Sequence, residues 1–273
     1  IKLSSANSIN IGRLIPQVVY YVVSYLELVT TDKIKLGDKV NFVVPTGNFG
    51  NILAGYYAEQ IGLPVNKLIC ASNNNNVLYD FLKTGVYDKN RDFLKTVSPS
   101  MDILISSNLE RLLYYVSGCD NAYVASLMKD LKETGRFEVT KEILNRIQEK
   151  FQTGFADDLD TKQTIKKIYE KDSYLLDTHT AVAYKVLLDN LDKEHVNVVL
   201  STASPYKFTE SVYTSLNEAT NEDEFTLMNK LYEQTKVDIP ENLKDLDKKE
   251  IRHKDVINKN EMKKYILEKL GDL

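Results

Sequence analysis

The sequence predicts an α/β fold with a parallel sheet. Residues 39–45 and 67–72 are short apolar runs rich in β-branched side chains, which is typical of buried strands, and residues 52–60 between them have a helical pattern. A strand, a helix and a strand in this order form a parallel βαβ unit. A third apolar run, residues 196–200, predicts another strand much later in the chain.

The composition is that of an ordinary soluble globular protein. Hydrophobic residues make up 43% and charged residues 27% of the 273 residues, values that exclude a disordered or fibrous chain. The net charge is −4 and the basic residues are scattered, so we expect no nucleic-acid partner. No apolar run reaches the roughly 18–20 residues of a membrane span, so we expect no membrane partner.

The two cysteines give little indication of a metal site. Neither belongs to a CxxC pair or lies near a histidine, so we predict no metal ligands among them. Cys70 ends an apolar run and is expected to be a buried thiol. A reducing, cytoplasmic location fits this cysteine usage.

Further helices are predicted before and after these strands in the sequence. Residues 8–29 have apolar side chains at three-to-four spacing, and Pro16 within them favours a kink. Further helices are expected at residues 77–84, 176–188 and 261–270.

Two domains follow from this pattern. Residues 1–216 are expected to form the α/β domain, in which residues 108–171 form a helical insertion with little strand character. Residues 217–273 are rich in Asn, Glu, Asp and Lys, and are expected to form a peripheral, partly helical C-terminal extension.

Two loops follow predicted strands and are the candidate ligand-binding segments, because ligands of α/β sheets bind at the carboxyl ends of the strands. Residues 46–51 place two glycines before a helix, where backbone N–H groups can turn toward a phosphate. Tight packing of a strand–helix connection explains the same pattern about equally well. The loop fits neither nucleotide fingerprint, so a simpler phosphate is favoured. Residues 201–205 form the second loop.

Four motifs resemble those of threonine synthases, in the same order. They are SANSIN at 5–10 with Arg13, PTGNFGN at 45–51, SPSMD at 98–102, and TASP at 202–205 with Lys207 and Phe208. The resemblance covers residues 4–216 and fades beyond them. It identifies the chain as similar to the C-terminal part of this pyridoxal-phosphate (PLP) enzyme family.

The resemblance implies a fold, a cofactor and a reaction. The fold would be type II of PLP enzymes, which is tryptophan synthase β-like, and the reaction would convert O-phosphohomoserine and water to threonine and phosphate. The residues implied to cradle the PLP phosphate are Gly47, Asn48, Phe49, Gly50 and Asn51.

Thr202 is the residue implied to face the pyridine nitrogen of PLP. A neutral hydroxyl can hydrogen-bond that nitrogen without forming an ion pair. The alternative interpretation is that Thr202 caps the helix near Lys207 or closes a strand.

Asn10 and Arg13 are the implied contacts to the substrate phosphate. They lie three residues apart, so their side chains share one helix face, and a guanidinium suits a phosphate monoester. The alternative for Arg13 is a surface ion pair. Ser8 is a candidate N-cap, and His179 is expected to be structural because Thr178 departs from the family pattern Asp-Pro-His.

The PLP-binding lysine of the family has no counterpart in this sequence, so no catalytic residue is assigned. Substitution by Lys207 is not expected, since the family has a lysine there as well. Because the chain starts at Ile1 without a Met, we expect a piece of a longer protein. Alone it should be inactive and bind PLP weakly or not at all.

Other interpretations remain. The chain could belong to another type II PLP lyase such as a threonine dehydratase, or it could be a non-catalytic protein that binds a phosphate ligand. An apolar face left exposed would favour self-association.

Overall fold

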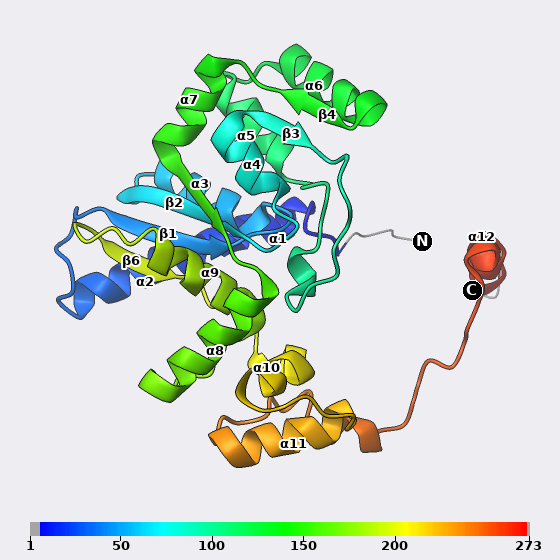
Figure 1. The fold of residues 1–273 in the computed structure, drawn as a ribbon. Coiled ribbons are helices and arrows are strands. Elements are labelled where there is room, and N and C mark those ends of the chain that lie inside the picture. Colours follow the sequence, from blue (N-terminus) through cyan, green and yellow to red (C-terminus); the bar gives the residue numbers. More distant parts are fainter. Residues whose placement is uncertain (1–5, 272–273) are drawn as a thin grey trace. The chain divides into compact units, whose positions relative to one another are not determined.

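A computed structural model of the protein describes residues 6–271 (Figure 1). The expectation based on the start of the chain at Ile1 therefore concerns residues outside the described range. The chain forms two compact units. The first unit ends at Asp238, and the second begins at Ile239.

A four-stranded parallel sheet lies at the centre of the first unit. Its strand order is β5-β2-β1-β6, and every neighbouring pair is parallel. This arrangement confirms the predicted α/β fold and the three predicted strands. The bounds are β1 (Val40–Pro45), β2 (Val65–Ser72), β5 (Phe151–Phe155) and β6 (Val196–Val199).

Strand β1 is buried on both faces because its side chains alternate between two apolar clusters. Phe42 and Val44 pack into one cluster, and Val43 packs into the other. Cys70 on β2 is buried as expected, and burial raises the pKa of its thiol to about 12.

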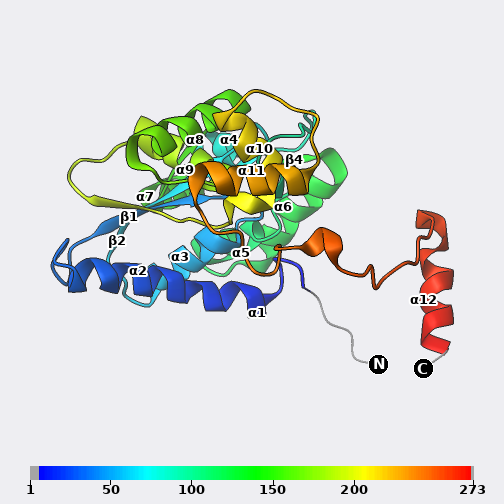
Figure 2. The same cartoon turned by 90° about the horizontal axis from the view of Figure 1, so that it is seen from below.

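Helices cover both faces of the sheet (Figure 2). Helix α9 packs on one face, and α2, α3, α4 and α7 pack on the other, in keeping with the two apolar clusters. The helices of the first unit are α1 (Ile11–Leu14), α2 (Val18–Thr30), α3 (Gly50–Gln60), α4 (Val77–Thr84), α5 (Leu109–Val116), α6 (Asn121–Thr134), α7 (Lys141–Lys150), α8 (Asp158–Asp172), α9 (Thr178–Asp189), α10 (Thr209–Leu216) and α11 (Glu224–Thr235), with 3₁₀ turns η1 (Ile15–Gln17), η2 (Pro99–Met101) and η3 (Pro205–Phe208).

The predicted kink in the first helix is a 3₁₀ turn. Pro16 lies in η1 between α1 and α2. Proline has no N–H to donate within a helix, which explains why the α-helical pattern is interrupted there.

The helical insertion expected at residues 108–171 requires a correction. Helices α5 to α8 lie there, but so do β4 (Arg136–Glu138) and β5, and β5 pairs with β2 at the edge of the main sheet. Strand β4 pairs with β3 (Val86–Asp88) in a two-stranded antiparallel sheet. The polar residues Gln152 and Thr153 and the adjacent Gly154 conceal the strand pattern of β5. This glycine is needed because a Cβ would lie 2.7 Å from Val186 on α9.

Helix α11 packs against α10 within the first unit, although its residues belong to the predicted extension. The second unit contains the turns η4 (Leu246–Lys248) and η5 (Lys259–Glu261) and helix α12 (Met262–Gly271). Asn258 and Glu261 form a capping box at the start of η5. No helix among the described residues is long and apolar enough to cross a membrane.

Gly55 allows α3 to pack closely on its neighbours. A Cβ at this position would lie 2.7 Å from Tyr21 Cε1 and 2.8 Å from Leu68 Cδ2. The Tyr21 ring is fully buried and packs edge-on against Phe42, with centroids 5.0 Å apart, so it has little room to move.

Gly55→Ala should therefore destabilise the first unit by about 1–3 kcal/mol, the usual cost of overpacking. The measurement is the midpoint of urea unfolding. Gly271→Ala is the matched control, because a Cβ there would meet no atom within 4 Å. Equal midpoints for wild type and Gly55→Ala would contradict the packing argument.

Candidate functional site

The candidate site lies at the carboxyl ends of β1 and β6. These strands are parallel neighbours, with Val43 opposite Val199, so the loops that follow them emerge side by side. The loop after β1 leads into α3, and the loop after β6 leads through η3 into α10. The structure thereby brings together two loops that lie about 150 residues apart in the sequence.

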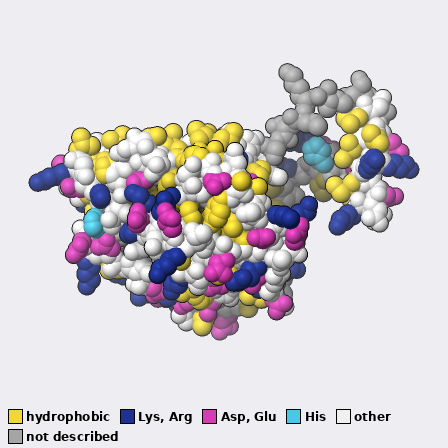
Figure 3. Space-filling view, turned by 90° about the horizontal axis from the view of Figure 1, so that it is seen from above, with side chains coloured by type: hydrophobic (Ala, Val, Ile, Leu, Met, Phe, Trp, Pro, Cys, Tyr) yellow, Lys and Arg dark blue, Asp and Glu magenta, His cyan; other side chains and the backbone are white. Residues whose placement is uncertain are grey.

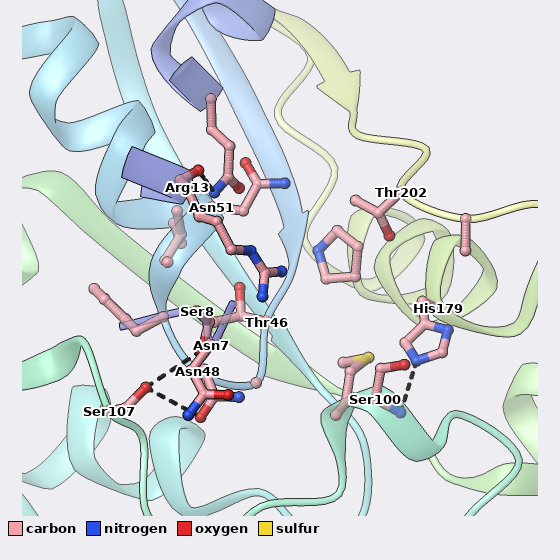
Figure 4. A pocket seen from close by; sticks show the side chains of 18 of the residues that line it. Asn7, Ser8, Arg13, Thr46, Asn48, Asn51, Ser100, Ser107, His179 and Thr202 are labelled. Atoms are coloured by element: carbon pink, nitrogen blue, oxygen red, sulfur yellow. Dashed lines mark hydrogen bonds between the residues drawn. The ribbon is translucent and has the colours of Figure 1, made fainter. Parts of the chain in front are cut away.

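A pocket of about 770 Å³ opens between these loops (Figure 4). Its lining contains the cations Arg13 and Lys207 and, among the described residues, no carboxylate, so its electrostatic potential favours an anion. The lining residues are Asn7, Ser8, Ile9, Arg13, Gln17, Pro45, Thr46, Gly47, Asn48, Phe49, Gly50, Asn51, Ile52, Ser100, Met101, Ser107, His179, Thr202, Ala203 and Lys207. Among the described residues, no group of three His, Cys, Asp or Glu side chains could hold a metal ion.

The loop before α3 is oriented by hydrogen bonds to its carbonyl oxygens. Ser106 Oγ donates to the Gly47 carbonyl at 2.9 Å, and Asn108 donates to the Asn48 carbonyl through its Nδ2 at 2.9 Å and its backbone N–H at 3.1 Å. In a trans peptide the N–H points away from the C=O. The N–H groups of Asn48 and Phe49 therefore point away from residues 106 and 108.

Phe49 sets the start of α3. It has a left-handed backbone conformation (φ 61°), which is uncommon for a residue other than glycine, and no side chain caps the helix. Its buried ring packs against Phe151, with centroids 5.7 Å apart, and this packing offsets the backbone strain. The first turn of α3 thus presents uncapped N–H groups and the positive end of the helix dipole at the pocket.

Gly47 allows the loop to approach the segment 98–102. A Cβ on Gly47 would lie 3.1 Å from the Ser100 carbonyl oxygen and 3.2 Å from Met101 Cα. The SPSMD motif is therefore in direct contact with the loop of residues 46–51, called the glycine loop below, although Gly47 and Ser100 are far apart in the sequence.

Asp102 holds the segment 98–102 in place. Its Oδ1 accepts hydrogen bonds from Asn73 Nδ2 (2.8 Å), Asn75 Nδ2 (2.9 Å) and Thr96 Oγ1 (2.7 Å), and its Oδ2 accepts one from the Thr96 N–H (3.0 Å). Asn73 and Asn75 are buried, and Asp102 supplies one of the acceptors of each amide group, beside Ser98 for Asn73 and Leu94 for Asn75.

His179 fixes the same segment from the other side. Its buried Nε2 accepts a hydrogen bond from the Ser100 N–H at 3.1 Å, so a neutral ring carries its proton on Nδ1. Asp177 caps α9 and accepts from the His179 N–H at 2.8 Å. Figure 4 shows His179 beside Ser100 at the edge of the pocket. These contacts agree with the expected structural role, because the Nε2 lone pair is already used.

Arg13 points into the pocket from α1, opposite Thr202 (Figure 4). Its guanidinium also donates to the Ala6 carbonyl. Asn10 has a different place: its Oδ1 accepts from the Gly12 N–H at 2.8 Å and caps α1, and it does not line the pocket. The N-cap is thus Asn10 rather than Ser8, whose Oγ instead lies 3.5 Å from that of Ser107.

Thr202 is exposed and lines the pocket from the loop after β6. It does not cap a helix, because Ser204 caps η3 and Phe208 precedes α10. Lys207 is the one lysine among the described lining residues, and its Nζ lies 5.3 Å from the centroid of the Phe208 ring.

Several pocket residues were not assigned from the sequence. Asn7, Gln17, Ser107 and Met101 line the pocket beside the assigned residues. Asn7 and Met101 lie inside recognised motifs, which could have indicated them. Gln17 and Ser107 lie outside every motif, and only the folded chain brings them to the pocket.

Comparisons with known proteins are consistent with this geometry. A human protein, threonine synthase-like 1, is 44% identical over 216 residues, which are 78% of this chain and 29% of the human protein. The threonine synthase of Saccharomyces cerevisiae is 40% identical over 236 residues, which are 80% of this chain and 45% of the yeast protein. The family model described as "Threonine synthase, C-terminal" matches residues 180–266.

Solved structures give the same result. PLP-bound threonine synthase from Brucella melitensis is 41% identical with a TM-score of 0.75, covering 83% of this chain and 48% of that one. The yeast threonine synthase superposes with a TM-score of 0.82 at 37% identity, covering 98% of this chain and 54% of the yeast chain. The chain is therefore similar to threonine synthases over most of its own length. It matches the C-terminal part of these proteins, and its fold is that of the PLP-dependent threonine synthases, fold type II.

The chain spans less than half the length of the curated relatives named above. The activity, substrate and partners of the whole enzymes are therefore properties of those proteins, whose remaining parts have no counterpart in this chain.

Asp102→Ala should destabilise the first unit by about 1–3 kcal/mol, because the donors of Asn73, Asn75 and Thr96 would each lose one acceptor. The free energy of unfolding in urea measures this cost. Asp92→Ala is the control, since Asp92 is exposed in the same connection. The hydrogen-bond account of the SPSMD segment is wrong if both variants unfold at the same urea concentration.

Proposed function

We propose that this chain forms the phosphate-binding part of a PLP site in a protein that converts O-phosphohomoserine and water to threonine and phosphate. The observation that carries the proposal is the loop of residues 47–51, whose backbone N–H groups start α3 without a capping side chain. It borders a pocket with two cations and no carboxylate among its described residues. This is the chemistry that a phosphate monoester requires.

The residues present fit the phosphate group of PLP. The peptide groups after Gly47 and Asn48 are fixed by Ser106 and Asn108, so their N–H groups are oriented before any ligand binds. Preorganised donors lose little free energy on binding. We infer that Gly47, Asn48, Phe49, Gly50 and Asn51 hold the phosphate of PLP, mainly through backbone N–H groups.

Thr202 is proposed to accept the ring end of the cofactor. When bound, PLP supplies an electron sink for reactions at the substrate's carbon atoms. The Thr202 hydroxyl can donate a hydrogen bond to the ring nitrogen while that nitrogen stays unprotonated. Ser204 provides the neighbouring helix cap, which leaves the Thr202 hydroxyl available for this contact.

Arg13 is proposed to bind the phosphate of the substrate. It enters the pocket from α1, whereas the glycine loop leads into α3. The phosphate of the substrate and the phosphate of PLP would therefore have separate sites. Gln17 follows one turn later and donates to the Arg13 carbonyl at 2.6 Å, which steadies this turn. Asn10 stays a predicted substrate contact, although its side-chain oxygen already caps α1.

The amine that holds PLP covalently in this family is proposed to come from outside this chain. Lys207 lines the pocket, but the family has a lysine at that position in addition to the PLP-binding one. We infer that the isolated chain is inactive, because it lacks the lysine amine that both holds PLP and moves protons during turnover.

Adding PLP to the isolated chain should therefore give no covalent adduct. The measurement is peptide mass spectrometry after borohydride reduction, which would fix any bond between PLP and a lysine. A denatured sample of the same chain serves as the control for non-specific labelling. Stoichiometric labelling of Lys207 in the folded chain alone would overturn the inference.

The function itself can be tested in a chimera. The N-terminal part of yeast threonine synthase, which this chain does not match, is joined to residues 6–273 of this chain. The chimera should release phosphate from O-phosphohomoserine, and Arg13→Gln should lower kcat/KM by about 10- to 100-fold through the loss of a charge-assisted hydrogen bond.

Arg91→Gln is the matched control, because Arg91 pairs with Asp80 at 2.8 Å and does not line the pocket. A folded, PLP-loaded chimera without phosphate release would reject the proposed reaction. Conversion of threonine to a 2-oxo acid by the same chimera would identify a dehydratase instead.

A further inference from the structure

Helices α1 and α2 carry an exposed apolar face. Its members are spaced four, four, four and three residues apart, so they form one strip along the helices. Their exposed fractions lie between 47% and 57%, which is high for apolar side chains in a row. The strip consists of Ile11, Ile15, Val19, Val23 and Leu26.

The opposite side of the same helices is already used. Leu14, Tyr21 and Tyr25 are buried against the rest of the first unit. Between residues 11 and 30 the only charged residues are Arg13 and Glu27, so the strip has almost no polar interruption. In Figure 3 hydrophobic side chains gather along the upper edge, which corresponds to the lower edge of Figure 2, where α1 and α2 lie.

Single exposed apolar residues are normal, but a contiguous strip is typical of an interaction surface. Arg13 and Gln17 line the pocket from the same helical segment, but each lies two residues from members of the strip, so they project from a different face of the helix.

The comparisons indicate what covers it. The chain superposes over 98% of its length on 54% of the yeast threonine synthase chain, so nearly half of that enzyme has no counterpart here. The unmatched half is the N-terminal part, because the chain matches the C-terminal part of its relatives. A second copy of this chain would supply only the same C-terminal part again.

We propose that the strip docks a polypeptide equivalent to the N-terminal part of a threonine synthase, carried on the same protein or on a separate chain. The strip supplies the apolar contact for the docked polypeptide. The proposal rests on the similarity to threonine synthases and on the strip, and it holds whether or not the proposed reaction occurs.

The test compares the isolated chain with the chimera described above. Val23→Cys is alkylated without PLP or substrate, and its rate is followed by peptide mass spectrometry. Val23 is 57% exposed in this chain, so its cysteine should react fast in isolation and at least about tenfold more slowly in the chimera. Leu159→Cys on α8, at a site that is 65% exposed, is the control and should react equally in both.

Other results would overturn the proposal. Equal rates for Val23→Cys in both proteins would show that the strip stays uncovered. Protection in the isolated chain that rises with its concentration would identify a second copy as the occupant.

A split version provides an independent measurement. The yeast N-terminal part is co-expressed with this chain as a separate tagged polypeptide and should co-purify with it. Val19→Glu combined with Val23→Glu should abolish co-purification, whereas Leu159→Glu should retain it. Far-UV circular dichroism confirms that the variants are folded. Co-purification that survives both glutamates would reject the strip as the docking surface.

Discussion

The parallel alignment of β1 with its neighbours is the constraint on which the rest of the structure depends. Because β1 is buried on both faces and pairs with β2 on one side and β6 on the other, its carboxyl end is fixed in the middle of the sheet. The loop after it cannot spread sideways and must turn directly into α3. The pocket exists because the loop after β6 emerges at the same edge, beside that turn.

Strands and helices with strong local patterns could be predicted from the sequence. β1, β2 and β6 are β-branched runs, and α4 has the predicted bounds, since its side chains follow a clear helical period. Strand β5 could not be predicted in the same way. It is short and carries polar residues and a glycine, and its strand conformation depends on pairing with β2 and packing beneath α9.

The candidate site shows the same division between local and distant information. The glycine loop and Thr202 follow strands directly, so their position could be predicted. The bonds that shape the site join residues far apart in the chain: Ser106 to Gly47 across 59 residues, and Ser100 to His179 across 79. No local pattern encodes such pairs. The sequence also suggested Ser8 as a helix cap, but the chain turns later and Asn10 takes that role.

Tyr21 connects α2 to the glycine loop through hydrogen bonds to Asn51. Burial raises the pKa of its hydroxyl well above the ordinary value, so the group stays a donor, and it binds Asn51 through the backbone oxygen at 2.8 Å and the side-chain oxygen at 2.9 Å. Asn51 lies in the first turn of α3. A displacement of α2 would therefore move Asn51 and change the orientation of the N–H groups at the start of α3. If docking on α2 changes the affinity of the loop for an anion, thermodynamic reciprocity requires that the anion change docking on α2 by the same factor.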